Sequence, residues 1–341
     1  MKDIKPLHGG VVVIGGSNID LQGRSLAPFV PGDSNPGRIV RAFGGVGRNI
    51  AENCVLLGLP TSLLTAFGDD EDGRLLEEDC AAKGIDANLS LRADAPTARY
   101  LCAIDADGSL VAAVADMAVM ELIGPEYLES RRPILDAAGC IVADANLPRR
   151  SLEWLASRYG RKARKAWKAD GLDSASPTGI RHFPLLFLDT VSSAKAARAI
   201  GLSGEFDCAK PNLAEAAVLA GTGEAGAEEL CARLAANGGM PSELYISLGG
   251  KGMYYYTSEG EEGHVSLPAP GSRPEPVNRS GAGDAACAAL VWATMRACPA
   301  REKARYALTA AMLASASPEP VARGLSPSSL MGSERLMFPE E

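Results

Sequence analysis

Short apolar runs that alternate with amphipathic stretches are the feature of this sequence that most limits its fold. The runs are continuous, as expected of strands that are buried on both faces, and they lie at Val11–Ile14, 139–143, 185–188 and 244–248. A further strand is expected at 61–66, and stretches with helical periodicity lie at 46–57, 73–83, 192–200, 212–220 and 227–237. This order predicts an α/β fold of three layers, in which helices cover both faces of a mostly parallel sheet.

Two segments depart from that alternation. Residues 21–43 are rich in Pro, Gly and Ser, and residues 99–116 contain two strand-like runs around Asp107-Gly108, which is a hairpin turn signal. Together they predict a small β-sheet that projects from the main sheet. That sheet would be either a lid over a cleft or an edge hairpin without function. We expect residues 1–341 to form a single domain that carries it.

Composition argues against several classes of partner. The chain of 341 residues has a formal net charge of -8, which is a weak argument against non-specific nucleic-acid binding. Its longest apolar run, 285–295, is too short to span a bilayer. The eight cysteines form no C-x-x-C pair, and dispersed free thiols fit a reducing compartment. We therefore expect a cytoplasmic protein without nucleic-acid or membrane partners, in which the basic segment 158–184 is a solvated helix end and a surface loop.

The strongest chemical motif is Gly281-Ala282-Gly283-Asp284, which opens an apolar helix. Small residues let backbone N–H groups converge at a helix N-terminus, where unpaired donors and the helix dipole bind anions. Asp284 would lie in the first helical turn. Taken alone, the motif is equally well explained as a glycine turn followed by a favourable first-turn acid.

A second glycine cluster, from Ser247 through Gly249 to Gly252, follows the apolar run 244–248. Glycines just beyond a strand allow close approach to a ligand's phosphate groups. A tight hairpin into the next strand would need the same glycines, and both interpretations can hold together.

The third motif is Lys210-Pro211-Asn212 followed by Glu215. Asn212 as a helix N-cap with Glu215 three residues later is a capping box. The same two side chains could also hold a hydrated Mg²⁺, which usually keeps most of its water ligands.

Two polar clusters lie near the N-terminus. Asn18 and Asp20 come just after the first strand and could pair with vicinal sugar hydroxyls. Gly44-Gly45, with Asn49 four residues later, opens a helix. Either cluster alone could be ordinary turn chemistry.

In this order, the five motifs resemble those of the ribokinase-like (PfkB) family of carbohydrate and nucleoside kinases. Gly44-Gly45 with Asn49 is similar to the family's first signature, and the segment from Ser280 to Asp284 is similar to the second. Asn212 and Glu215 match its N-x-x-E motif. The resemblance runs from about residue 11 to about residue 316.

Within the family, several phrases are similar to the pseudouridine kinase subfamily. These are the segment 33–37, which contains Ser34 and Asn35, the segments 45–51, 115–117 and 142–144, and Lys210-Pro211-Asn212. The resemblance implies ATP-dependent phosphorylation of the 5′-hydroxyl of pseudouridine. Asn278 stands where many relatives carry Asp near a monovalent-cation site.

The resemblance also implies roles for individual residues. Asp284 would be the catalytic base, with Gly281, Ala282 and Gly283 forming an anion hole. Asn212 and Glu215 would hold Mg²⁺, and K⁺ is the monovalent cation to consider. The expected substrate ligands are Asn18, Asp20, Ser34, Asn35, Gly44, Gly45, Asn49 and Asp116. The expected nucleotide ligands are Lys210, Ser247, Gly249, Gly252 and Ser280. A homodimer is expected, with a small molecule as substrate.

Several alternatives stay open. Another nucleoside, ribose or a phosphosugar could be the acceptor, and Arg38, Arg41 and Arg48 are the cations that a phosphosugar would need. A non-catalytic nucleoside sensor on the same scaffold is a second alternative. A Rossmann dehydrogenase is a third, although the sequence has no G-x-G-x-x-G to match Gly15-Gly16.

Overall fold

The structure is a computed structural model that describes residues 9–169, 182–278 and 280–339. In this part of the chain, the largest element is an eight-stranded sheet with the order β14-β13-β12-β11-β10-β9-β1-β4. The strands from β12 to β4 run parallel, and β13 and β14 are added antiparallel at one edge. The bounds are β1 (Val11–Ile14), β4 (Thr61–Leu64), β9 (Cys140–Asp144), β10 (Leu185–Asp189), β11 (Cys208–Ala209), β12 (Glu243–Ser247), β13 (Met253–Thr257) and β14 (Glu262–Val265).

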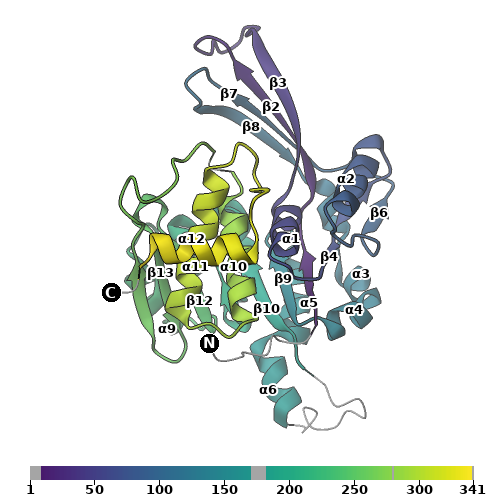
Figure 1. Cartoon of the computed structure of the whole chain (residues 1–341). Helices are drawn as coiled ribbons and strands as arrows, with labels where there is room; N and C mark the ends of the chain where they lie inside the picture. The colour runs from purple at the N-terminus through teal and green to yellow at the C-terminus, as the bar shows by residue number, and fades with distance from the viewer. Residues whose placement is uncertain (1–8, 170–181, 279, 340–341) are drawn as a thin grey trace.

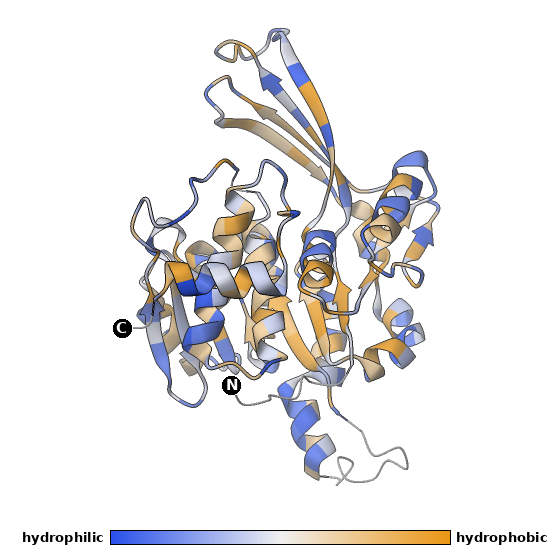
Figure 2. Ribbon diagram, viewed as in Figure 1, coloured by the Kyte–Doolittle hydropathy of each residue, from blue (hydrophilic) through white to orange (hydrophobic). Residues whose placement is uncertain are grey.

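Successive side chains of the parallel strands enter two different cores, because a strand alternates between the faces of its sheet. Val11 and Val13 belong to one core and Val12 and Ile14 to the other. Both sets are buried, which explains why these strands are apolar throughout. The expected three-layer α/β architecture is confirmed, and Figure 2 shows the apolar strands between the two helical layers.

The first core is covered by helices from distant parts of the chain. It includes buried residues of α1 (Val46–Leu56), α2 (Glu71–Ala82), α10 (Ala282–Thr294), α11 (Ala300–Ser315) and α12 (Pro327–Met337). The second includes residues of α3 (Pro125–Ser130), α4 (Arg132–Ala137), α5 (Arg149–Tyr159), α7 (Ser193–Ala196), α8 (Leu213–Ala220) and α9 (Ala227–Ala236). Helix α1 packs against α10, and this contact joins the two ends of the chain (Figure 1).

A separate four-stranded sheet, which we call the lid sheet, has the order β3-β2-β7-β8. It consists of β2 (Asn18–Ser25), β3 (Gly37–Gly44), β7 (Arg99–Ile104) and β8 (Leu110–Asp116). These strands come from the two segments that the sequence singled out. Figure 1 shows the sheet projecting from the body beside α1.

Two expected elements differ in the structure. The strand at 61–66 divides after Leu64, because β5 (Ala66–Gly68) leaves the main sheet and pairs with β6 (Leu91–Ala93). The helix at 192–200 is α-helical only over Ser193–Ala196 and tightens into a 3₁₀ turn over Ala197–Ala199, a common ending for a helix.

The basic segment starts with Arg158 in the last turn of α5 and continues in helix α6 (Arg161–Ala169). Helix α6 has no buried residue and extends below the body in Figure 1. Arg164 pairs with Asp207, and Lys162 pairs with Glu205. The solvated helix end is therefore confirmed, while residues 170–181 of the segment lie outside the described residues. No helix in the described ranges has both the length and the apolarity needed to cross a membrane.

Candidate active site

The site lies where β1, β9 and β10 end, because parallel strands bring their carboxyl ends to one edge of the sheet. Asp144 closes β9 and lies directly opposite Asp189, which closes β10. The Asp144 carboxylate accepts hydrogen bonds from the backbone N–H groups of Gly16 and Asn146, both at 2.8 Å. Burial nevertheless raises the pKa of Asp144 to about 6.

Asp284 lies in the first turn of α10, at the same edge. The helix starts after Gly281, whose φ of 78° is left-handed, and no described side chain caps its N-terminus. A Cβ at Gly281 would lie 1.9 Å from the carbonyl oxygen of Pro320, so glycine is required there. Gly283 is exposed whereas Asp284 is buried. Uncapped N–H groups of this kind can bind an anion, so we call the start of α10 the anion-binding turn; it lies next to a buried carboxylate.

Burial is the main reason that the pKa of Asp284 is raised to about 7, and the neighbouring carboxylate of Asp189 raises it further. A hydrogen bond from Asn49 and the charge of Lys210 oppose that rise. A carboxyl group with such a pKa can accept and release a proton near neutral pH.

Lys210 supplies a buried positive charge beside the turn. Its Nζ lies 3.3 Å from the Oδ2 of Asp189. The same Nζ would be 3.5 Å from a Cβ built on Gly283, so the ammonium group adjoins the anion-binding turn. Burial opposes the charge of Lys210, but Asp189 and further acidic neighbours outweigh this and raise its pKa. Lys210 is therefore a permanent cation in the site.

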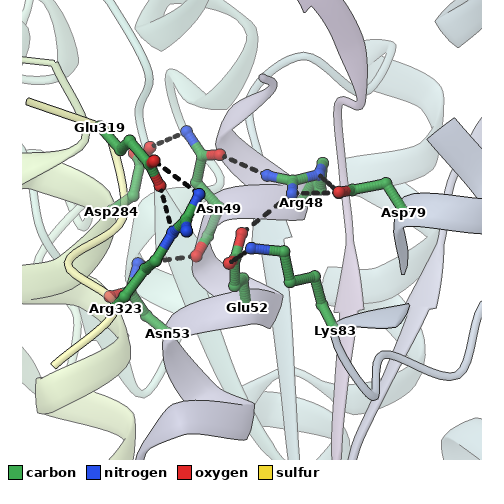
Figure 3. A network of polar contacts seen from close by, with 9 residues as sticks. All are labelled: Arg48, Asn49, Glu52, Asn53, Asp79, Lys83, Asp284, Glu319 and Arg323. Atoms are coloured by element: carbon green, nitrogen blue, oxygen red, sulfur yellow. Dashed lines mark hydrogen bonds and ion pairs between the residues drawn. The ribbon is translucent and has the colours of Figure 1, made fainter. Parts of the chain in front are cut away.

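Asn49 connects the two glycine signatures. Its Nδ2 donates to the Oδ2 of Asp284 over 2.9 Å, although the two residues are 235 positions apart (Figure 3). Helix α1 begins at Gly45 with a φ of 101° and without a side-chain cap from the described residues. A Cβ on Gly45 would lie 2.4 Å from the carbonyl oxygen of Gly16, so the helix can start this close to β1 only with glycine there.

The base of the lid sheet contributes Asn18 and Asp20. The Nδ2 of Asn18 donates to the Oδ1 of Asp20 over 2.6 Å. Burial raises the pKa of Asp20, and the Asn18 hydrogen bond and the charge of Arg48 oppose the rise. A Cβ on Gly44 would lie 2.2 Å from the Oδ2 of Asp20, so Gly44 leaves room for that carboxylate. The structure therefore groups these three expected residues at the first turn of α1.

Three expected substrate ligands lie elsewhere. Ser34 and Asn35 belong to the loop between β2 and β3, at the far end of strands that extend roughly 23 Å from Asn18. The Asn35 side chain is bonded within that loop, to the backbone N–H and C=O of Val30 at 2.8 and 2.9 Å. Asp116 pairs with Arg99 in the register of the lid sheet, whereas Asp20 pairs with Tyr100. Adjacent strand positions point to opposite faces, so Asp116 lies on the face opposite Asp20.

The expected nucleotide ligands lie in two places. Ser247, Gly249 and Gly252 are at the end of β12 and in the turn after it, and Ser280 precedes α10. The backbone N–H of Ser247 donates to the carbonyl of Pro211 over 3.0 Å, which places it beside Asn212. Gly249 and Gly252 have φ values of 58° and 105° in the turn between β12 and β13. A Cβ on Gly252 would lie 2.0 Å from the carbonyl oxygen of Val265, so the hairpin itself needs this glycine. Ser280 is exposed at the start of the anion-binding turn.

Asn212 and Glu215 form the predicted capping box at the start of α8. The Oε2 of Glu215 accepts from the Asn212 backbone at 2.9 Å and from Thr190 Oγ1 at 2.6 Å. Its Oε1 accepts from Asn212 Nδ2 at 2.7 Å. Because most lone pairs are used, these oxygens suit a metal held through water better than one bound directly. Among the described residues, no group of three or more His, Cys, Asp or Glu side chains could hold a metal ion.

Other residues of the site were not predicted. Asp144 and Asp189 could have been found as acids that end apolar runs, because strand ends meet at one edge. Val191 has a φ of 63°, which is unusual for a β-branched residue, and its N–H donates to Asp189 Oδ1. The ion pair between Glu319 and Arg323 lies near Asn49 in Figure 3. Their spacing of four residues is a local ion-pair pattern, but it does not indicate a position near Asn49.

A buried carboxylate, an uncapped helix N-terminus and a buried cation are the parts needed to move a phosphoryl group to an alcohol. Residues 9–322 match the family described as pfkB family carbohydrate kinase. The chain is 34% identical to a pseudouridine kinase of Escherichia coli (strain K12), over 87% of each chain. It is 30% identical to the uncharacterized sugar kinase YeiI of that organism, over 90% of this chain and 78% of the other. A structure of Arabidopsis thaliana ribokinase complexed with ribose and ATP superposes with a TM-score of 0.77 at 20% identity, covering 96% of this chain and 99% of the other.

The family match and the kinase relatives thus identify a phosphotransferase that acts on an alcohol group. The chain belongs to the pfkB family of carbohydrate kinases, and its acceptor is a sugar or a nucleoside.

Proposed function

We propose that this protein transfers the γ-phosphoryl group of ATP to the 5′-hydroxyl of pseudouridine, releasing ADP. The observation that carries the reaction is the buried Asp284 carboxylate at the uncapped N-terminus of α10, bonded to Asn49 and near Lys210. The choice of acceptor is supported by the relative that is 34% identical over 87% of the chain, which is a pseudouridine kinase.

In this mechanism Asp284 accepts the proton of the substrate's 5′-hydroxyl. The oxygen then forms a bond to the γ-phosphorus, while the bond from that phosphorus to the β–γ bridging oxygen breaks and leaves ADP. The N–H groups at the start of α10 would hold the transferring oxygens where negative charge develops. Lys210 would add a fixed positive charge at the same place. Asn18, Asp20 and Asn49, with Gly45, would hold the sugar and orient its hydroxyl.

The phosphate chain of ATP would run from the anion-binding turn toward Gly249 and Gly252. A Mg²⁺ ion would neutralise these phosphates, and Asn212 and Glu215 would hold it through water because their oxygens are already bonded within the capping box. The lid sheet would close over the acceptor and exclude water, so that ATP is not hydrolysed. In this proposal the chain acts as a single kinase domain with its lid.

The contacts of Asn278 argue against a bound potassium ion. The Oδ1 of Asn278 accepts from the backbone N–H of Ser280 at 2.9 Å, and its Nδ2 donates to the carbonyl of Pro318 at 3.3 Å. One lone pair of the amide oxygen is thus already used, and the neutral amide lacks the negative charge that a carboxylate would offer a cation. We infer that activity does not require K⁺, and no step is assigned to it.

A phosphosugar acceptor is disfavoured by the arginines. Arg48 is buried and paired with Glu52 and Asp79, and Arg41 pairs with Asp72. Two of the three cations that could bind a second phosphate are thus already neutralised. A neutral nucleoside fits the remaining charge better.

A homodimer is supported by one face of the lid sheet. Register places Ile39, Leu101 and Val114 on the same face, and they are 80%, 52% and 65% exposed. A contiguous apolar patch of this kind marks an interaction surface. We propose that two copies of the chain pack these faces together, which analytical ultracentrifugation of Leu101→Glu against the native chain would test.

The decisive experiment measures ADP release with ATP and Mg²⁺ over pseudouridine, uridine, ribose and fructose 6-phosphate. A strong preference for pseudouridine, lost in Asp284→Ala, is expected. Turnover of another acceptor alone would refute the substrate. Absence of turnover with every acceptor, in folded protein, would refute pseudouridine as the substrate and leave an acceptor outside the panel or a nucleoside sensor.

A further inference from the structure

Arg48 has no role in the mechanism above, yet its side chain is only 4% exposed. It lies in the first turn of α1, directly before Asn49. Its Nη2 pairs with Glu52 at 2.9 Å, and its Nε donates to the Oδ2 of Asp79 in α2 at 3.1 Å. Lys83 completes the cluster through a 2.7 Å contact with Glu52 (Figure 3). Two cations and two carboxylates balance, so the cluster carries no net charge.

The remaining arm of the guanidinium group points toward the site. Its Nη1 donates to the Oδ1 of Asn49 over 3.1 Å. Arginine has only donors, whereas an amide group has an acceptor on one side and a donor on the other. Arg48 therefore requires the oxygen of Asn49 to face it. The NH₂ group must then face Asp284, to which it donates at 2.9 Å.

We propose that Arg48 is a positioning residue, which holds the Asn49 amide in the one orientation that presents a donor to the Asp284 carboxylate. This inference rests on the proposed function, in which Asp284 is the catalytic base. In this inference Asp79 and Glu52 hold Arg48, Arg48 orients Asn49, and Asn49 donates to the carboxylate that accepts the proton. The hydrogen bond of Asn53 Nδ2 to the Asn49 carbonyl, at 2.8 Å, holds the backbone but not the amide.

Loss of the Arg48 contact would free the amide to rotate. A rotated amide turns its oxygen toward Asp284, and two acceptors in contact repel each other. The carboxylate would shift, and its ionised form would lose a stabilising donor. The charged groups that face Asp284 from other elements are Asp144 of β9, Asp189 of β10 and Lys210 after β11. None of them replaces the lost donor, because Lys210 already pairs with Asp189.

Arg48→Lys is the test variant, because lysine keeps the positive charge near Glu52 and Asp79 but lacks the forked donors. Lys83→Met is the matched control, since it removes a cation from the same cluster without touching Asn49. We expect kcat of Arg48→Lys to fall roughly tenfold to a hundredfold, the scale of a misplaced catalytic group. The acidic limb of its pH–rate profile should move to higher pH. Lys83→Met should stay within about twofold of the native kcat, a change smaller than loss of a catalytic contact.

A double-mutant cycle separates positioning from general structural support. In the background of Asn49→Ala, Arg48→Lys should cause little further loss, because the residue through which it acts is gone. Losses that multiply, or a pH limb that does not move, would overturn the inference. The pair Arg48→Met with Glu52→Gln is a second variant that keeps the cluster neutral should Arg48→Lys not fold, and the same non-additivity with Asn49→Ala is expected of it.

The activity of the native enzyme shows whether a negative result concerns the proposed function or only the role of Arg48. If it phosphorylates none of the acceptors, the proposed function fails and the role of Arg48 fails with it. If it phosphorylates any acceptor and the cycle is additive, only the role of Arg48 fails. Every measurement uses the full chain and the acceptor that the native enzyme turns over.

Discussion

The carboxyl group of Asp284 should weaken the fold that holds it. Its pKa in the folded protein is about 7, against 3.8 for an ordinary aspartate, mainly because of burial. Moving a pKa from 3.8 to about 7 corresponds to about 4 kcal/mol between the two protonation states. The folded state binds the proton more tightly than the unfolded state. The stability associated with Asp284 is therefore complete below about pH 4 and is lost as pH rises toward 7.

Asp284→Asn removes that cost while keeping the shape of the side chain and an acceptor for Asn49. The variant should be more stable than the native chain at pH 8. Its advantage should grow by about 2 to 3 kcal/mol between pH 5 and pH 8, because up to about pH 7 the unfolded carboxyl is ionised while the folded one still holds its proton. Lys210 stays paired with Asp189 in both proteins, so its charge is not left alone.

Urea unfolding without ligands, at pH 5 and pH 8, measures this difference. Asp94→Asn is the matched control, since Asp94 is exposed and its substitution should change stability little at either pH. A stability difference between Asp284→Asn and the native chain that does not change with pH would refute the reasoning. So would a variant that is less stable than the native chain at pH 8.

Three further results are expected. Gly281→Ala should destabilise the fold by at least about 1 to 3 kcal/mol and abolish turnover, because its Cβ would meet Pro320. Thermal unfolding measures the loss of stability. Gly332→Ala, on the open surface of α12, is the control and should be neutral or stabilising. Lys210→Met should cost about 3 to 5 kcal/mol by leaving Asp189 buried and unpaired. Adding Asp189→Asn should restore most of that stability in urea but not the kcat. Replacing K⁺ by Na⁺ in the kinase assay should leave kcat unchanged, and a large stimulation by K⁺ would contradict the role given to the Asn278 amide.

The main architecture could be predicted because its causes are local. Runs such as Val11–Ile14 are apolar at every position, which only a strand covered on both faces requires. Gly45 and Gly281 mark close backbone approaches, and Gly44 leaves room for the Asp20 carboxylate. The capping box joins Asn212 to Glu215, three positions later. Each of these features depends on residues that are close together in the sequence, so periodicity and motif spacing are enough to predict it.

The composition of the site depended on the tertiary structure. The hydrogen bond between Asn49 and Asp284 exists because α1 packs on α10. The sequence around either residue does not indicate that the other is its partner. Sequence similarity grouped Ser34, Asn35 and Asp116 with the substrate ligands. The structure places the first two at the far end of the strand that starts at Asn18, and strand alternation places Asp116 on the face opposite Asp20.

By itself, the sequence determined the layers, the two glycine-opened helices and the chemical types available at the edge of the sheet. Tertiary structure alone decided which charges are buried together. Asp144, Asp189, Lys210 and Asp284 come from four separate segments. The shifted pKa values of Asp144, Lys210 and Asp284 follow from the distances between the charges and from loss of water. Those quantities exist only after the chain has folded, because electrostatic coupling depends on position in space and not on order along the chain.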